Sequence, residues 1–236
     1  MVEMAKDIAP ALLEKLRNAF TEKINQNKKI DEIYLVIQEG KPTYSEVNEL
    51  SIEVGDILAE VFQENLSSEI LPDGRMYYNI AKRTVEPMMV NNYNIITNNA
   101  AEVQEQLNQA AGMRIKAQVP VLNQSRIDGI IDRLDAEELF DNIKWILDEP
   151  VKNFTQAIVD DMVEANIDFH HKLGLQPKII RKAEPNCCNW CSEIDGVYEY
   201  PDVPEDIYRR HRFCRCTVEY DPGDSRRQDV WTKQWR

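Results

Sequence analysis

The chain is poor in the residues that most enzymes use for catalysis and phosphate binding. Its 236 residues include only three histidines and eight glycines, and no cysteine occurs among the first 186 residues. Few histidines leave few candidates for general acid-base catalysis, and without a glycine-rich loop the usual cradle for nucleotide phosphates is missing. No apolar run approaches the roughly 18 residues that span a bilayer. We therefore expect a soluble intracellular protein with no membrane contact and no small-molecule substrate.

Acidic side chains outnumber basic ones, and the excess lies entirely in the N-terminal three quarters of the chain. The formal net charge is −13. Residues 1–177 contain 30 Asp and Glu against 17 Lys and Arg, whereas residues 178–236 contain eleven of each. A surface of this sign repels the phosphate backbone of a nucleic acid. The charge therefore disfavours broad binding of duplex DNA by the N-terminal region.

Apolar residues recur at steps of three and four through most of residues 1–177, which is the spacing of one helix face. The pattern predicts a mainly α domain of about six helices. The asparagine-rich stretch at 91–94 is expected to cap a helix or to form a loop, because asparagine favours such positions. Ser125 and Asp128 have the spacing of a capping box at the start of a later helix.

After Pro177 the sequence changes from helical to strand-like patterns. Short β-type segments lie at 178–181, 197–200 and 216–220. Asp195-Gly196 has the form of a hairpin turn. Such a region is too small to bury a large core of its own, and a bound metal would supply the missing folding free energy. We therefore predict a helical domain at 1–177 and a small zinc-stabilised α+β module with a C-terminal tail at 178–236.

Five cysteines and one histidine fall within thirty residues near the end of the sequence, at Cys187, Cys188, Cys191, His211, Cys214 and Cys216. Cys188 and Cys191 have the Cys-x2-Cys spacing of a tight turn that presents two thiolates to one metal. Cys214 and Cys216 lie two residues apart, so both sulfurs would face one side of an extended segment. Zinc takes four such ligands in a tetrahedron. The sequence predicts one structural Zn²⁺, with ligands drawn from Cys188, Cys191, His211, Cys214 and Cys216.

Which four donors bind stays open at the level of the sequence. Cys187 is the first candidate for a spare cysteine, and the other outsider would be His211 or one of Cys214 and Cys216. A disulfide framework is one alternative, but the odd cysteine count and the absence of an apolar signal segment in the opening MVEMAKDIAP argue against it. Buried structural thiols are a second alternative, although three cysteines in five positions beside asparagine and tryptophan make a poor core strand.

The predicted metal site is expected to be structural, and the protein is expected not to be an enzyme. A catalytic zinc keeps one coordination position open for water, whereas five or six candidate ligands here compete for four positions. Zinc deaminases pair their cysteines with an upstream H-x-E, but neither His170 nor His171 is followed two residues later by glutamate. The metalloprotease pattern H-E-x-x-H is absent from the chain as well.

Arginines and tryptophans near the metal-binding pattern are the candidates for contacting a partner. The segment around His211 is locally basic because it carries Arg209, Arg210, Arg212 and Arg215. These side chains would contact nucleic acid or an acidic protein face, or would simply solvate a small module. Tryptophans in the tail would anchor an interface or cover the metal module. The residues predicted to bind a partner are Arg209, Arg210, Arg212, Trp231 and Trp235.

The order of these motifs resembles the C-terminal domain of the phage Mu F-like minor head proteins, a family of phage head morphogenesis proteins. The resemblance covers about 60 residues, from Lys178 to the end of the chain. It lies in Cys188-x2-Cys191, in Asp195-Gly196 with an aromatic residue following, and in the run from Pro204 that ends in His211-x2-Cys214-x-Cys216. The tail segment from Arg226 to Trp231 is similar to versions found in phages of Gram-positive bacteria.

The resemblance implies a structural minor head (minor capsid) protein without enzyme activity. Such a protein would associate with the portal protein and with capsid or scaffold proteins, contact packaged DNA, and act in head morphogenesis and in genome packaging or ejection. Its location would be the virion, in the capsid interior or portal region, after assembly in the host cytoplasm. Two alternatives are a zinc-dependent nuclease or hydrolase, using a carboxylate such as Glu193 or Asp195, and a zinc-finger nucleic-acid binder using the arginines around His211.

Overall fold

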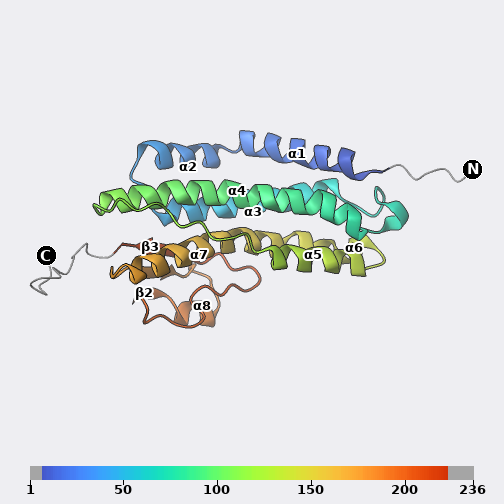
Figure 1. Cartoon of the computed structure of the whole chain (residues 1–236). Coiled ribbons are helices and arrows are strands. Elements are labelled where there is room, and N and C mark those ends of the chain that lie inside the picture. Colours follow the sequence, from blue (N-terminus) through green and yellow to red (C-terminus); the bar gives the residue numbers. More distant parts are fainter. Residues whose placement is uncertain (1–6, 223–236) are drawn as a thin grey trace, which may run out of the picture.

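Residues 7–222 are described in the computed structural model of the chain, and they form an elongated stack of helices with a small sheet beneath one end (Figure 1). The helices are α1 (Ala9–Gln26), α2 (Lys28–Glu39), α3 (Tyr44–Asn65), α4 (Tyr78–Ala110), α5 (Gln124–Ala136), α6 (Phe140–Ile143), α7 (Glu149–Lys172) and α8 (Asn189–Glu193). Short 3-10 turns occur at η1 (Pro72–Gly74) and η2 (Lys144–Leu147). Within this range six helices have twelve residues or more, and the predicted mainly α fold with a small C-terminal α+β part is confirmed.

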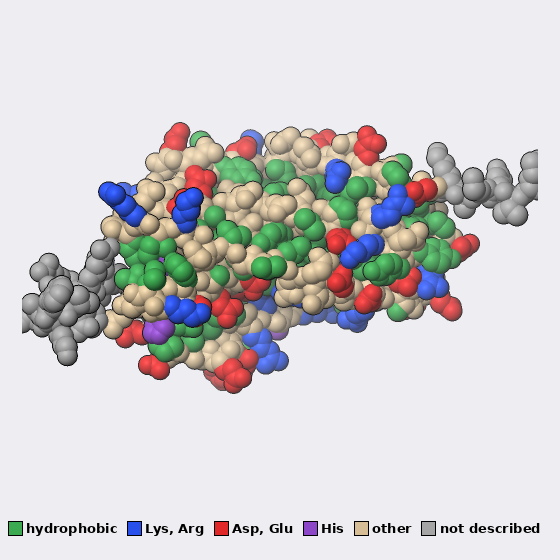
Figure 2. All heavy atoms as spheres, viewed as in Figure 1, with side chains coloured by type: hydrophobic (Ala, Val, Ile, Leu, Met, Phe, Trp, Pro, Cys, Tyr) green, Lys and Arg blue, Asp and Glu red, His purple; other side chains and the backbone are tan. Residues whose placement is uncertain are grey.

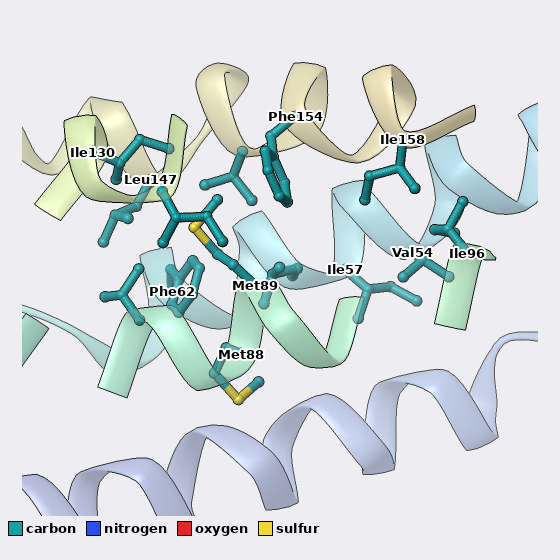
Figure 3. Packing of buried hydrophobic residues seen from close by; sticks show 14 of the residues in the cluster. Val54, Ile57, Phe62, Met88, Met89, Ile96, Ile130, Leu147, Phe154 and Ile158 are labelled. Atoms are coloured by element: carbon teal, nitrogen blue, oxygen red, sulfur yellow. The ribbon is translucent and has the colours of Figure 1, made fainter. Parts of the chain in front are cut away.

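The helices lie in three layers, with α1 and α2 on one side, α3 and α4 in the middle, and α5 to α7 on the other side (Figure 1). The middle layer is buried on both faces, because α4 contacts α1 as well as α5 and α7. Figure 3 shows Phe154 and Ile158 of α7 pointing toward α3 and α4, while Met88 of α4 points away from α7, toward α1. Full burial of one such side chain contributes about 1.5 to 3 kcal/mol. Apolar packing therefore holds the helical layers together.

Hydrogen-bonding side chains fix where two helices begin. Thr43 and Glu46 form a capping box at the start of α3, in which the Thr43 backbone N–H donates to the Glu46 carboxylate at 2.7 Å. The capping box predicted at Ser125 and Asp128 is wrong. Asn123 caps α5 instead, because its side-chain oxygen accepts from the Arg126 N–H at 3.3 Å.

The asparagine-rich stretch at 91–94 lies inside α4, so the predicted cap or loop there is wrong. Asn92 is fully buried, and its side-chain amide donates to Thr155 Oγ1 at 2.5 Å across the interface with α7. Asparagine in a helix interior costs only about 0.7 kcal/mol relative to alanine, and a buried hydrogen bond of this kind contributes about 1 kcal/mol. Tertiary contact therefore overrides the local preference.

Three antiparallel strands, ordered β2-β1-β3, form the C-terminal sheet: β1 (Lys178–Lys182), β2 (Gly196–Glu199) and β3 (Thr217–Asp221). They lie where the sequence predicted them. Asp195-Gly196 does not form the expected tight hairpin turn, because residues 183–195, including α8, separate β1 from β2. Instead the Asp195 carboxylate accepts the Ala183 backbone N–H at 3.1 Å, and this bond closes the long connection at its base.

The sheet and the helices share one apolar core, which includes Ile179 of β1 and both Val218 and Tyr220 of β3. Asn48 of α3 adds a buried hydrogen bond to the Val218 carbonyl at 2.8 Å. The division of the chain at residue 177 into two folding units stays a prediction.

On the face drawn in Figure 2, acidic and basic side chains are interspersed with apolar ones over the helical layers. None of the helices between residues 7 and 222 is both long and apolar enough to cross a membrane.

Candidate metal centre

Cys188 and Cys191 are placed on the same side of a tight turn by the short helix α8. Cys188 is the residue that caps the N-terminus of α8, and Cys191 is in its first turn. Interaction with the Cys191 backbone N–H, the largest cause, lowers the pKa of the Cys188 thiol. Hydrogen bonds to a sulfur favour its charged form. This half of the site is therefore shaped to present a thiolate.

The second half is a turn from His211 to Cys214 that leads into β3. The Cys214 N–H donates to the His211 carbonyl at 3.1 Å. Between them Phe213 has a left-handed backbone conformation, with a φ of 64°. Such a conformation costs a residue with a side chain about 1 to 2 kcal/mol, and strain of this kind concentrates at functional sites. The turn brings His211 and Cys214 back beside α8.

All five predicted metal ligands meet around one sulfur, that of Cys191. The His211 Nε2 atom lies 3.0 Å from the Cys191 sulfur and 3.3 Å from the Cys188 sulfur. The sulfurs of Cys191 and Cys214 are 4.0 Å apart. The donor atoms form two sets, and within each set all atoms lie within 4.8 Å of one another. One set comes from Cys188, Cys191 and His211, and the other from Cys191, Cys214 and Cys216. We call these five residues the Cys/His cluster; Cys187 belongs to neither set.

The measured spacings approach those of a zinc tetrahedron. Zinc–sulfur bonds of about 2.3 Å and zinc–nitrogen bonds of about 2.0 Å place two sulfurs about 3.8 Å apart and a sulfur and a nitrogen about 3.5 Å apart. The observed sulfur–sulfur distance of 4.0 Å and sulfur–nitrogen distances of 3.0 and 3.3 Å need shifts of only a few tenths of an ångström. Each set of three donors could therefore hold a metal of this size, and a fourth donor from the other set would have to move closer to complete a tetrahedron.

The hydrogen bond on the far side of the His211 ring selects the tautomer that a metal ligand requires. His211 Nδ1 lies 2.7 Å from the Arg212 carbonyl oxygen. A carbonyl can only accept, so Nδ1 carries the hydrogen and Nε2 keeps its lone pair directed at the sulfurs. Metal-binding histidines are commonly oriented in this way by a carbonyl or carboxylate.

A buried arginine indicates that the cluster carries negative charge. Arg181 in β1 is fully buried, and its guanidinium donates to the Ile207 carbonyl at 2.8 Å and approaches the Cys214 sulfur at 3.9 Å. Among the described residues it forms no salt bridge with a carboxylate. A buried charge is costly unless it is compensated. A zinc ion with three thiolates and one imidazole has a net charge of −1, which would compensate Arg181.

Without a cation the buried cysteines resist ionisation. Burial raises the pKa of Cys191, and the neighbouring sulfurs of Cys214 and Cys216 raise it further. Burial also raises the pKa of Cys216. Three sulfurs this close cannot all be thiolates unless a positive ion lies among them. A bound metal would account for both the donor set and the buried arginine.

No carboxylate belongs to either set of donor atoms within the described part of the chain. The Asp195 carboxylate is used by the Ala183 N–H, and Glu193 is exposed on α8. A hollow of about 520 Å³ lies beside the cluster, with Glu184 and Cys187 in its wall. Cys188 is exposed at its rim, whereas Cys191, Cys214 and Cys216 are buried.

The residues predicted to bind a partner have different environments. Arg209 and Arg212 are exposed, and Arg209 pairs with Asp206 at 3.3 Å. The prediction for Arg210 is corrected, because its side chain is only 3% exposed and binds Asp160 of α7 through two bonds of 2.5 and 2.7 Å. It therefore ties the module to the helices and is not available to a partner. Trp231 and Trp235 lie outside the described residues.

Sequence reasoning missed Arg181. The alternation of burial along β1 places Arg181 on the same inward face as Ile179. The sequence could have indicated its role, because side-chain alternation puts this arginine on the buried face of a strand that leads into the cysteine turn.

In comparisons with known proteins, no family model matches this chain, and neither a curated protein nor a solved structure matches it.

Proposed function

We propose that the C-terminal module is a structural zinc site, with Cys191 and three of the other four cluster residues as ligands. The observation that carries this proposal is the convergence of sulfur and imidazole donors from two distant segments on Cys191. A set of soft sulfur donors with one imidazole suits zinc, which prefers a tetrahedral arrangement and has no redox chemistry.

The geometry favours a structural role for this metal over a catalytic one. Five donors are available for four positions, so protein ligands can fill the coordination shell and leave no position for water. A zinc-dependent nuclease or hydrolase would also need a nearby carboxylate as a base. Among the described residues the two donor sets contain none, and Asp195 is already engaged by a backbone N–H, which leaves Glu184 in the wall of the adjacent hollow as the carboxylate that such an enzyme would use.

The arginines around the cluster give little support to a zinc-finger nucleic-acid binder. Arg210 is buried against Asp160, and Arg215 pairs with Glu149 at 3.2 Å. Arg209 pairs with Asp206. Of the four arginines that bracket His211, only Arg212 forms no salt bridge with a described residue. Phosphate contacts by the other three would require breaking existing pairs.

The wider function that we propose is that of a phage minor head protein, which docks on the portal or on the inner capsid and has no enzymatic activity. Support comes from the resemblance of the sequence motifs. The residues of these motifs form structural contacts in this fold. Asp195 closes the loop that contains α8, and His211, Cys214 and Cys216 complete the cluster. The acidic helical layers would provide the extended surface for a partner.

Cobalt substitution tests the metal assignment. Tetrahedral Co²⁺ bound to thiolates absorbs strongly in the visible and near-ultraviolet, so the purified protein refolded with Co²⁺ should show thiolate bands. Cys191→Ser should abolish these bands, whereas Cys187→Ser should leave them unchanged because Cys187 belongs to neither donor set. Single Ser variants of Cys188, Cys214 and Cys216 should identify any spare ligand. Unchanged spectra in Cys191→Ser would exclude the proposed site.

Co-expression with the portal protein of the same phage genome tests the head role. Tagged portal protein should retain this chain through purification. Repeated failure to co-purify, with both proteins folded, would refute the portal partnership without affecting the metal assignment.

A further inference from the structure

A second concave surface, separate from the proposed metal ligands except for His211, lies between α5, η2 and the loop that precedes β3. It is a groove of about 490 Å³. Its rim carries Arg126 and Arg133 of α5, Trp145 of η2 and Arg212 of the loop, and Ile130 and Phe154 form part of its floor. We call it the Arg/Trp groove. In Figure 2, Lys and Arg side chains lie along the lower edge of the molecule, beneath the helical layers.

The groove is positive in a protein that is otherwise strongly acidic. The chain contains 41 Asp and Glu, yet none of those within residues 7–222 lines the groove, although Asp160 and Asp161 act on Arg126 from beside it. Arg126, Arg133 and Arg212 form no salt bridge within residues 7–222. Other arginines of the same region form salt bridges with carboxylates, as Arg215 does with Glu149. Three unpaired guanidinium groups around one hollow therefore favour a negatively charged ligand.

Aromatic rings hold all three arginines in place, and the Arg126 guanidinium lies 5.8 Å from the centre of the Phe154 ring. The Arg133 guanidinium lies 5.3 Å from the centre of the Trp145 ring, and that of Arg212 lies 5.8 Å from the same ring. Arg212 is also 4.8 Å from the ring centre of Phe213. Trp145 is 41% exposed and Phe213 is 63% exposed. Stacked guanidinium groups keep their N–H edges free for an oxyanion, and Trp and Arg are the residue types that dominate binding energy at protein interfaces.

We propose that the Arg/Trp groove binds an acidic peptide segment of a partner protein, with carboxylates on the arginine rim and apolar side chains on the floor. Arg126 and Arg133 are seven residues apart on one helix, which separates them by about 10 Å, or about three residues of an extended peptide. Ile130 lies between them on the floor. The rim and floor thus match a segment in which acidic and apolar residues alternate.

A nucleic acid fits this surface less well. Guanidinium groups already lie over the Trp145 ring, which therefore offers less open face for stacking a base. The net charge of −13 also repels a polyanion more strongly than a short peptide with a few carboxylates. The inference does not depend on the head role, but Arg212 of the rim and His211 of the lining belong to the loop that the proposed metal would order.

Fluorescence anisotropy with the full-length protein tests the inference. The probe is a fluorescein-labelled peptide (Asp-Leu-Glu)4, and the comparison ligands are (Lys-Leu-Arg)4 and oligo(dT)12 with the same label. The acidic peptide should bind more tightly than either. Arg126→Gln/Arg133→Gln should weaken its binding about tenfold, because two charged contacts are lost.

Arg17→Gln/Arg114→Gln is the matched control. It removes two positive charges from exposed arginines outside the groove, and it should leave the affinity for (Asp-Leu-Glu)4 unchanged. Equal weakening by both double variants would overturn the proposal, because it would mean that only net charge matters. Tighter binding of oligo(dT)12, or no saturable binding of the acidic peptide, would overturn it too. Zinc content, which should be the same in all variants, separates this outcome from a failure of the metal site.

Discussion

If a metal is bound as proposed, the helical layers and the Cys/His cluster are held together by different forces. The layers share one continuous apolar core that extends from Leu12 in α1 to Tyr220 in β3. The cluster is a separate small group in which Cys191, Cys214 and Cys216 are buried, with Ala183, Cys187 and Trp190 partly buried around them. So few apolar atoms cannot offset the entropy of ordering the loops. Coordination is therefore expected to order the lobe formed by residues 183–195 and 209–216, whereas apolar burial orders the rest.

The junction between the two regions is a buried ion pair. Arg210, from the segment that also carries His211, binds Asp160 of α7 and in addition donates to the Cys216 carbonyl at 2.8 Å. Both side chains are almost fully buried. The lobe is thus attached at a fixed position on α7, and its stability can be measured separately from that of the layers.

Loss of the metal should have the largest effect and should be confined to the lobe. Binding of structural zinc contributes about 10 to 16 kcal/mol in small zinc modules, so Cys191→Ser or chelation should unfold residues 183–195 and 209–216. The helical layers and strands β1 and β3 should remain folded, since they belong to the apolar core. Hydrogen exchange measured by mass spectrometry would map the change, and Cys187→Ser is the control. Simultaneous loss of protection in α3 and α7 would show that the two regions fold as one unit.

Breaking the junction should have the next largest effect. Asp160→Asn leaves the Arg210 guanidinium buried without its counter-charge, which costs about 3 to 5 kcal/mol. Urea denaturation monitored by circular dichroism would measure this loss in the free energy of unfolding. Asp206→Asn is the matched control, because it removes the exposed partner of Arg209 and should cost at most about 1 kcal/mol. Similar losses in both variants would mean that the buried pair has no special role.

Replacing Arg181 should weaken metal binding. Arg181→Met keeps most of the buried volume but removes the positive charge beside Cys214, so the zinc affinity should fall about tenfold, as for loss of one charged hydrogen bond. Competition with a chromophoric chelator would measure this. Lys182→Met, which changes the exposed neighbour that pairs with Glu219, should have little effect. An unchanged affinity in Arg181→Met would show that the cluster is not negatively charged.

The smallest effect concerns pH and the helical layers. Burial, and secondly the neighbouring Asp160, raises the pKa of Asp161 to about 6. The folded state therefore favours protonated Asp161, and this stabilisation is complete below pH 4 and is lost as the pH rises through about 6. Asp161→Asn should stabilise the protein at pH 7.5 by about 1 kcal/mol, allowing for partial solvent exposure. The gain in thermal stability should shrink between pH 7.5 and pH 5; a gain that grows on acidification would contradict the assignment.

The parts of this fold that were predictable from sequence depend on local patterns. The three strands and the helical periodicity follow from side-chain alternation and spacing, and the Cys-x2-Cys turn follows from ligand spacing. Asn92 was misjudged because its partner, Thr155, lies 63 positions away. Arg210 was misjudged for the same reason, since Asp160 is 50 positions distant. The Arg/Trp groove is lined by residues from three separate segments, so no local sequence pattern predicts it.

Zinc stoichiometry of the native protein tests the central claim most directly. Protein purified under reducing conditions, with no added metal or chelator, should contain about one zinc per chain by native mass spectrometry. Its cluster thiols should react with a thiol reagent only after chelation. A folded protein without zinc, in which all five cysteines react at once, would contradict the account.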